Sequence, residues 1–406
     1  MFGRIWVSSL LALAVVMAGA PAASAYSPNG GSIFNNPFGT NARQYAIQNH
    51  FRKSIASTRR GDVIRISTWR LNDGITTTKL IRAHRRGVDV RMLIHNRGKQ
   101  VRRLRQVVGS RRSARSFVYN CRHGCRTSRA SSLHSKFMLF SSAGRSNKVV
   151  MVSSSNLTHQ HATQGWNDVY TVVGRPGMYG FFKSVFYQMA QDHGYRNPYR
   201  VQTVDRFRAY VFPRRGTTAH SDTIYHELMG VRCSGARGGA GERGKTAIRV
   251  AMFNWRGARG EKLARKLVNL DDAGCIVRVI YGAPTARVAS ILKRRTSHGG
   301  IALYDSRRDS NNNGVADKYV HMKCLMISGH VRRDRSSWKV YTGSANWTRE
   351  ALRYADEVIL RISGGGPHKR YKVHWNDMAR KSRPVGRRTA GFQADVFTEL
   401  KMPESN

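Results

Sequence analysis

The chain carries the stretch LHSKFMLF at residues 133–140 and a second stretch of the same pattern, VHMKCLMI, at residues 320–327. In both, a histidine and a lysine two positions apart precede an apolar run that is typical of a buried strand. Side chains two apart on a strand share one face, so each copy sets an imidazole beside an ammonium. The duplication indicates a chain built from two related halves.

The sequence around these stretches repeats in the same order. A strand, a helix, a glycine and a second strand occupy residues 63–94 and again residues 247–281. The interval from Gly87 to His134 is 47 residues, and so is the interval from Gly274 to His321. Strand, helix, glycine and strand is typical of a parallel crossover. We therefore predict an α/β fold of two similar lobes, each a mixed sheet flanked by helices, with the active site at the pseudo-twofold seam.

Further short strands are expected in both halves. They are predicted at residues 136–140 and 149–152, and at 323–327 and 339–342. Composition then divides the chain into a signal peptide (1–25), an extended lead-in (26–40), an N-terminal lobe (41–200), a C-terminal lobe (206–380) and a tail (381–406).

The first 25 residues predict export. Arg4 precedes a short apolar run, and Ala23-Ser24-Ala25 has the small-x-small pattern of a cleavage site. No later stretch approaches the roughly 18 apolar residues of a membrane span. We therefore expect a soluble extracellular protein after cleavage near Ala25.

Export to an oxidising compartment would allow the five cysteines to form disulfides. They are Cys121, Cys125, Cys233, Cys275 and Cys324. The odd count leaves at least one thiol unpaired. Cys121 and Cys125 flank a tight loop and predict a local disulfide, with a metal site that includes His123 as the alternative. Cys275 and Cys324 lie in apolar runs, so we expect them to be buried as small apolar side chains or to pair with Cys233.

Each histidine-lysine pair is followed by a serine and an asparagine, in Ser154-Ser155-Asn156 and in Ser344-Ala345-Asn346. Two such sets meeting across a seam would surround one anion with two imidazoles, two ammoniums and two amides. Phosphodiester cleavage without a metal needs such a set: a nucleophile, an acid for the leaving group and fixed positive charge.

In these motifs the chain resembles the phospholipase D superfamily over residues 41–375. The resemblance implies a covalent phosphohistidine, with His134 as the nucleophile and His321 as the acid. It implies that lysines and asparagines hold the phosphate and that acidic residues about a dozen positions after each asparagine orient the histidines. The residues so implied are Lys136, Lys323, Asn156, Asn346, Asp168 and Glu357. We expect Ser154, Ser344 and Trp166 to line the substrate.

The chain departs from the family pattern at one place in each half. Ser141 and Ser328 stand where many members carry an aspartate. Some members that act on nucleic acid also lack this aspartate. The segment Asp309 to Asp317 has the oxygen-rich start of a calcium loop but lacks the final bidentate ligand, so a polar turn is favoured. Arginines at 102, 103, 105, 111 and 112 form either a solvated face or a polyanion groove.

Charge bears most directly on the substrate. The chain has 70 Lys and Arg against 23 Asp and Glu, a formal charge of +47. Such a surface favours a polyanionic partner. We expect a phosphodiesterase that needs no cofactor or metal and no obligate protein partner. Its expected substrate is a phospholipid headgroup on an anionic membrane, with DNA or RNA as the alternative. A non-catalytic polyanion-binding protein is the competing hypothesis.

Overall fold

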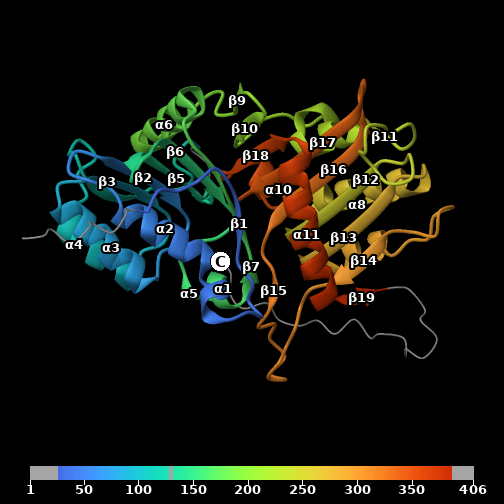
Figure 1. Cartoon of the computed structure of the whole chain (residues 1–406), viewed down its shortest axis with the longest axis horizontal. Coiled ribbons are helices and arrows are strands. Elements are labelled where there is room, and N and C mark those ends of the chain that lie inside the picture. Colours follow the sequence, from blue (N-terminus) through green and yellow to red (C-terminus); the bar gives the residue numbers. More distant parts are fainter. Residues whose placement is uncertain (1–25, 128–130, 386–406) are drawn as a thin grey trace, which may run out of the picture.

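The computed structural model describes residues 26–127 and 131–385. Figure 1 shows two sheets side by side, each flanked by helices. The first sheet has the strand order β1-β8-β6-β5-β2-β3-β4. Its strands are β1 (Gly31–Phe34), β2 (Val63–Thr68), β3 (Asp89–Ile94), β4 (Phe117–Asn120), β5 (Phe137–Ala143), β6 (Ser146–Ser153) and β8 (Asp168–Val172).

The second sheet has the order β19-β14-β13-β12-β16-β17-β18-β10-β9, with β11 paired to β16. Its strands are β9 (Arg200–Val204), β10 (Phe207–Val211), β11 (Val231–Arg232), β12 (Ala247–Trp255), β13 (Ile276–Pro284), β14 (Ala302–Asp305), β16 (Lys323–Val331), β17 (Asp334–Gly343), β18 (Val358–Ser363) and β19 (Arg383–Val385). Strands β7 (Gly165–Trp166) and β15 (Tyr319–Val320) pair with each other between the two sheets.

The helices flank the sheets. In the first half they are α1 (Asn41–Gln44), α2 (Ala46–Ala56), α3 (Gly74–Arg85), α4 (Lys99–Val108), α5 (His159–Thr163) and α6 (Pro176–Gln191). In the second half they are η1 (Ala219–Ser221), α7 (Thr223–Met229), α8 (Gly257–Asp272), α9 (Ala286–Leu292), α10 (Arg349–Arg353) and α11 (Gly365–Lys381).

The duplication predicted from the sequence is confirmed in the strand order. The run β8-β6-β5-β2-β3-β4 in the first sheet corresponds to β18-β17-β16-β12-β13-β14 in the second. The pairs β2–β3 and β12–β13 are parallel and are bridged by α3 and α8, as the crossover pattern predicts. The strands that follow the histidines, β5 and β16, pair antiparallel with β2 and β12.

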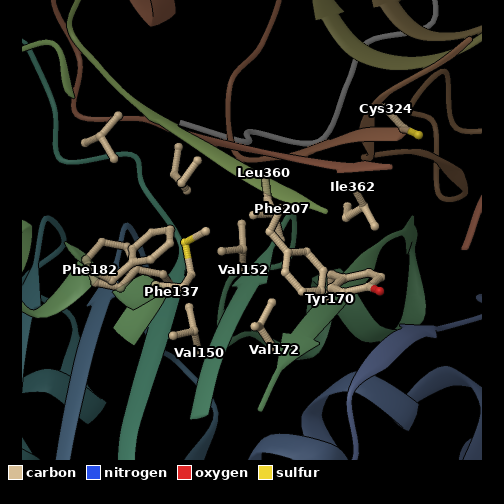
Figure 2. Close-up of a cluster of buried hydrophobic side chains, with 14 of the residues drawn as sticks. Phe137, Val150, Val152, Tyr170, Val172, Phe182, Phe207, Cys324, Leu360 and Ile362 are labelled. Atoms are coloured by element: carbon tan, nitrogen blue, oxygen red, sulfur yellow. The ribbon is translucent and has the colours of Figure 1, made fainter. Parts of the chain in front are cut away.

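A shared apolar core joins the lobes. Figure 2 shows side chains from the two sheets packed against one another. Phe137, Val150, Val152, Tyr170, Val172 and Phe182 come from the first lobe, and Phe207, Cys324, Leu360 and Ile362 come from the second. Because this core spans the seam, burial of apolar surface fixes the lobes relative to each other.

Two predicted segments contribute more to the sheets than their composition suggested. The lead-in at 26–40 contains β1, which extends the first sheet by pairing with β8. Strand β9 straddles the expected boundary between residues 200 and 206 and lies in the second sheet through its hairpin with β10. The predicted signal peptide and most of the tail lie outside the described residues.

Two disulfides are present. Cys121 bonds Cys125, as predicted, and Cys233 bonds Cys275, while Cys324 is a buried free thiol. The second bridge closes a segment with a sequence separation of 42. In the chain-entropy picture a loop of that length stabilises the fold by about 4 kcal/mol, against about 2 kcal/mol for the short one. Among the described residues, no helix is long and apolar enough to cross a membrane.

Candidate active site

Each predicted catalytic histidine lies on its own lobe and is held by the backbone of the other. The backbone N–H of His134 donates to the carbonyl of Asp356 at 3.0 Å, and that of His321 donates to the carbonyl of Trp166 at 3.0 Å. Leu133 bridges Asp356, and β15 pairs with β7, immediately before the two histidines. The two half-motifs therefore meet at one seam, related by the pseudo-twofold repeat.

The ring of His134 is oriented by Glu357 from the opposite lobe. Nδ1 of His134 lies 2.7 Å from Oε1 of Glu357, and the other carboxylate oxygen accepts from the hydroxyl of Ser344. A carboxylate on Nδ1 keeps the proton there and leaves the Nε2 lone pair free. The His134 side chain keeps 18% of its surface exposed.

The ring of His321 is oriented by Asn167, an amide. Nδ1 of His321 lies 2.9 Å from Oδ1 of Asn167. The Asn167 amide nitrogen donates to the carbonyls of His161 and Gly165 at 2.9 and 3.1 Å, which fixes its oxygen toward His321. Ser154 donates to the same oxygen at 3.0 Å. The proton of His321 is thus also held on Nδ1, but without a counter-charge.

The prediction that Asp168 orients a histidine is therefore corrected. Asp168 begins β8 and is fully buried, and its Oδ2 accepts from the hydroxyls of Thr342 and Tyr371. Alternation along the strand turns its side chain away from the face that Asn167 presents to His321. Asp168 still bears on the site, because burial and Lys136 lower the pKa of Lys323 and the charge of Asp168, after that of Glu357, opposes this shift.

Lys136 and Lys323 are the positive charges of the seam. They are 2% and 4% exposed, and among the described residues neither has a carboxylate within ion-pair distance. Lys136 donates to the carbonyl of His134 at 2.6 Å, and Lys323 donates to that of His321. Burial lowers the pKa of Lys136 to about 7, with Glu357 opposing, and holds the pKa of Lys323 well below its usual value. An anion bound between them would restore both charges.

The predicted asparagines contact residues next to the seam. The backbone N–H of Asn156 donates to Nδ1 of His161 at 2.7 Å, and its buried Oδ1 has no partner among the described residues. The side-chain oxygen of Asn346 accepts from the backbone of Asn254 at 3.3 Å. Both amides thus sit beside the motif that the sequence assigned them to.

Three predicted substrate contacts are corrected to structural roles. Ser154 and Ser344 are 0% exposed and bond Asn167 and Glu357, so they position the residues that orient the histidines. Trp166 is buried and packs against the rings of Phe38 and His374, while its backbone carries the contact to His321. None of the three side chains is free to line a substrate.

Sequence reasoning missed two residues at this seam. His161, on α5, has its ring centroid 4.0 Å from that of His321. Burial, and next the charge of Lys323, lower the pKa of His161 well below its usual value. Trp69 follows β2, and its ring packs edge-on against that of His134 with 5.9 Å between the ring centroids. His161 has no counterpart in the repeat, since Ala351 occupies its place in the second copy. Trp69 corresponds to Phe253, whose ring centroid lies 4.6 Å from that of His321.

Other predicted features lie apart from the seam. Ser141 accepts from the backbone of Val63 and Ser328 from that of Gly241, both at the far ends of their strands. Asp309 accepts from backbone N–H groups of Asn313 and Gly314, as a polar turn does. These positions therefore do not contribute to the chemistry of the histidines.

The pKa values give a pH profile for a diester with a good leaving group. Burial lowers the pKa of His134 to about 4, with Glu357 opposing the shift. A neutral nucleophile is then available above about pH 4, and the Lys136 ammonium is retained below about pH 7. We expect kcat/KM for bis(p-nitrophenyl) phosphate to be bell-shaped between these values. An acid limb near pH 6.5 with the fold intact by circular dichroism would contradict the assignment.

Each lobe carries a histidine and a lysine of the repeated motif, and the two histidines meet at one seam, an arrangement that matches the phospholipase D superfamily. Residues 51–185 and 242–378 match the family model described as cardiolipin synthase, PLD-like domain. Because the match covers more than half of the chain, the protein belongs to this family. It is a phosphodiester-processing enzyme of the phospholipase D superfamily.

Solved structures share this fold at low sequence identity. The phosphatidylserine synthase of Haemophilus influenzae Rd KW20 is 12% identical over 84% of this chain and 86% of its own, with a TM-score of 0.56. The polyphosphate kinase of Porphyromonas gingivalis is 14% identical over 84% of this chain, with a TM-score of 0.52. This chain spans 45% of that kinase. No curated protein matches the chain by sequence.

Proposed function

We propose that the protein cleaves phosphodiesters without a metal, through a covalent intermediate on His134. Nε2 of His134 attacks phosphorus and the bond to the leaving oxygen breaks, as His321 donates a proton to that oxygen. Water then gives its proton to His321 and attacks phosphorus, and the P–N bond breaks. The observation that carries this proposal is the reciprocal support of the two histidines by Glu357 and Asn167 across the seam.

Lys136 and Lys323 would stabilise charge on the phosphate oxygens. Both ammoniums are buried and hydrogen-bonded to the carbonyl of the neighbouring histidine, so they are fixed before the substrate arrives. Preorganised charge of this kind is worth more in a water-poor site than in solution. It also explains why the resting site favours an anion, since two buried cations repel each other.

For the substrate we propose a nucleic acid, with a phospholipid headgroup second. The charge of +47 supports a partner with many phosphates. Membrane enzymes add an apolar surface to charge. The large exposed apolar side chains of the described residues are Phe38, Ile75, Tyr187, Met229 and Val373, which come from five separate segments. The phospholipid alternative is supported by the description of the matching family.

We also propose that the protein acts outside the cell, as the first 25 residues predict. The two disulfides support this proposal, because disulfides persist in oxidising compartments. Expression of the full chain in a secreting host, with mass measurement of the medium fraction, tests it. Recovery only as an uncleaved intracellular chain would contradict export.

Turnover should survive a chelator, since the positive charge comes from Lys136 and Lys323. The mature protein is incubated in EDTA with single-stranded DNA, duplex DNA and phosphatidylcholine vesicles, and strand cleavage and headgroup release are scored. We expect strand cleavage in EDTA that is lost in His134→Ala. Loss of cleavage in EDTA with recovery in a divalent ion, and an unchanged melting curve, would contradict the mechanism. Headgroup release alone would move the substrate to phospholipid.

A further inference from the structure

A strongly cationic groove lies outside the seam of the two histidines. It is a groove of about 720 Å³ between the segment after α6, the segment after β10 and the helices α8 and α10. None of the histidines, lysines or asparagines of the catalytic set lines it. Its cationic lining residues are Arg126, Arg196, Arg215, Arg259, Lys262, Arg349 and Arg353, and its aromatic ones are Tyr195 and Tyr354.

The charges of this groove are largely uncompensated. Asp222 is the one carboxylate among its lining residues, and Arg259 takes both of its oxygens at 2.7 and 3.2 Å. Within the described residues, the other cations of the groove form no ion pair. At Arg353, burial lowers the pKa, the charge of Asp222 opposes this shift, and the charges of Arg259 and Arg349 add to it. Packing like charges together costs stability, and a bound polyanion offsets that cost.

The groove is built in advance of any ligand. Arg353 is held by the carbonyls of Arg214 and Ser221 at 2.8 and 3.2 Å. The guanidinium of Arg349 lies over the ring of Tyr354 at 5.7 Å, and that of Arg126 over Tyr195 at 6.0 Å. Arg196, Arg215 and Arg349 are exposed at its rim. Cations and aromatic rings thus alternate along one surface.

The groove shares a wall with the catalytic seam. Arg259 donates to the backbone carbonyls of Asn346 and Thr348 at 2.9 and 3.0 Å. Tyr354 stands three residues before Glu357, on the segment whose Asp356 carbonyl accepts from His134. A polymer bound in the groove would therefore lie close to the seam that holds His134 and His321.

We propose that this groove binds the phosphate backbone of a single-stranded nucleic acid and leads one of its phosphodiesters to His134. Several fixed cations match a chain of repeating phosphates. The half-buried ring of Tyr354 matches an unpaired base, whereas the ring of Tyr195 is stacked on His193. A single lipid headgroup carries too few phosphates to use these cations. The delivery step rests on the proposed phosphodiesterase activity, whereas binding in the groove does not.

The test compares two triple variants that each remove three exposed arginines. The groove variant is Arg196→Gln, Arg215→Gln and Arg349→Gln, and the matched control is Arg59→Gln, Arg82→Gln and Arg85→Gln, three exposed arginines on α3 and before β2. Binding of a fluorescein-labelled single-stranded oligonucleotide is followed by anisotropy over a salt series, in the His134→Ala background to prevent cleavage. Turnover of the oligonucleotide and of bis(p-nitrophenyl) phosphate is followed with His134 intact.

Each lost phosphate contact to a single strand lowers the salt slope of log K by about 0.7, so the groove variant should lose about 2. The control should keep the wild-type slope. The groove variant should also lose oligonucleotide cleavage while it keeps turnover of the small diester. This combination supports the groove. If the wild type turned over neither substrate but the groove variant still lost salt slope relative to the control, the proposed phosphodiesterase function would be contradicted and binding in the groove would be supported.

Equal slope losses in the two variants would overturn the proposal, since diffuse charge would then explain binding. An unchanged slope in both would overturn it as well. Phosphatidylglycerol vesicles provide a separate arm, measured by sedimentation with each variant. Vesicle binding that falls only in the groove variant, with oligonucleotide binding intact, would assign the groove to an anionic lipid surface and overturn the nucleic-acid proposal.

Discussion

His134→Ala is expected to abolish the covalent phosphoryl adduct and to reduce turnover of every substrate by roughly 10⁴-fold or more, because the covalent route is lost. The ring is oriented by Glu357 at 2.7 Å and is partly exposed, so no change of fold is needed for attack. Mass spectrometry of the denatured protein at mildly alkaline pH, where phosphohistidine survives, detects the adduct after incubation with bis(p-nitrophenyl) phosphate.

A surface histidine provides the control for that experiment. His298 is exposed, and its Nδ1 lies 3.1 Å from the backbone carbonyl of Asp272, at the end of α8. His298→Ala should keep both adduct and turnover. An adduct on His321 in the His134→Ala protein would reverse the roles of the two histidines. Absence of adduct in the wild type and in every variant would instead favour the non-catalytic, polyanion-binding hypothesis.

The two-lobe α/β fold could be predicted from the sequence because it depends on local apolar patterns and on the spacing between them. The equal intervals from Gly87 to His134 and from Gly274 to His321 required the same elements in both halves. Strand-helix-strand crossovers have one common geometry, so two such units predict two parallel strand pairs. The structure adds β1, whose place in the first sheet depends on a pairing with β8 more than a hundred residues later. Composition alone does not specify such long-range contacts.

The error at Asp168 shows where residue type misled the search for the site. Ser344 precedes Glu357 by the same number of residues as Ser154 precedes Asn167, so strict register identifies Asn167. A search for a carboxylate selected the next residue, on the opposite face of the strand. His161 was missed because it breaks the symmetry of the repeat, and Trp69 was missed because its counterpart, Phe253, is a different aromatic residue. The groove joins segments around residues 126, 196, 215 and 349, which only folding brings together.

The unequal orienting groups give the two histidines unequal chemistry. A ring that has attacked phosphorus carries positive charge, and Glu357 offers His134 a carboxylate to balance it. Asn167 holds the tautomer of His321 and offers no such balance. Burial and the charge of Lys323 keep the pKa of His321 well below its usual value, so it takes up a proton only when an anion is bound nearby. Once protonated, it is a strong acid for the leaving group.

His321→Ala should therefore show a loss that depends on the leaving group. Nitrophenolate leaves without protonation, so adduct formation on His134 should be retained with bis(p-nitrophenyl) phosphate. The alkoxide of an oligonucleotide needs a proton, and its cleavage should fall by about 10²- to 10⁴-fold. His321 also serves as the base for water, so the adduct should accumulate. Rapid mixing should then show a burst of nitrophenolate followed by slow turnover.

Accumulation of the adduct separates this role from a structural one. A residue that only packs the seam would, when removed, reduce adduct formation and oligonucleotide cleavage together, with no burst. Asn167→Asp supplies the matched comparison, because a carboxylate on Nδ1 should raise the pKa of His321 and weaken it as an acid while the ring stays in place. If His321→Ala lost activity on both diesters equally and the wild-type adduct mapped to His321, His321 would be the nucleophile, and Glu357 would orient the acid.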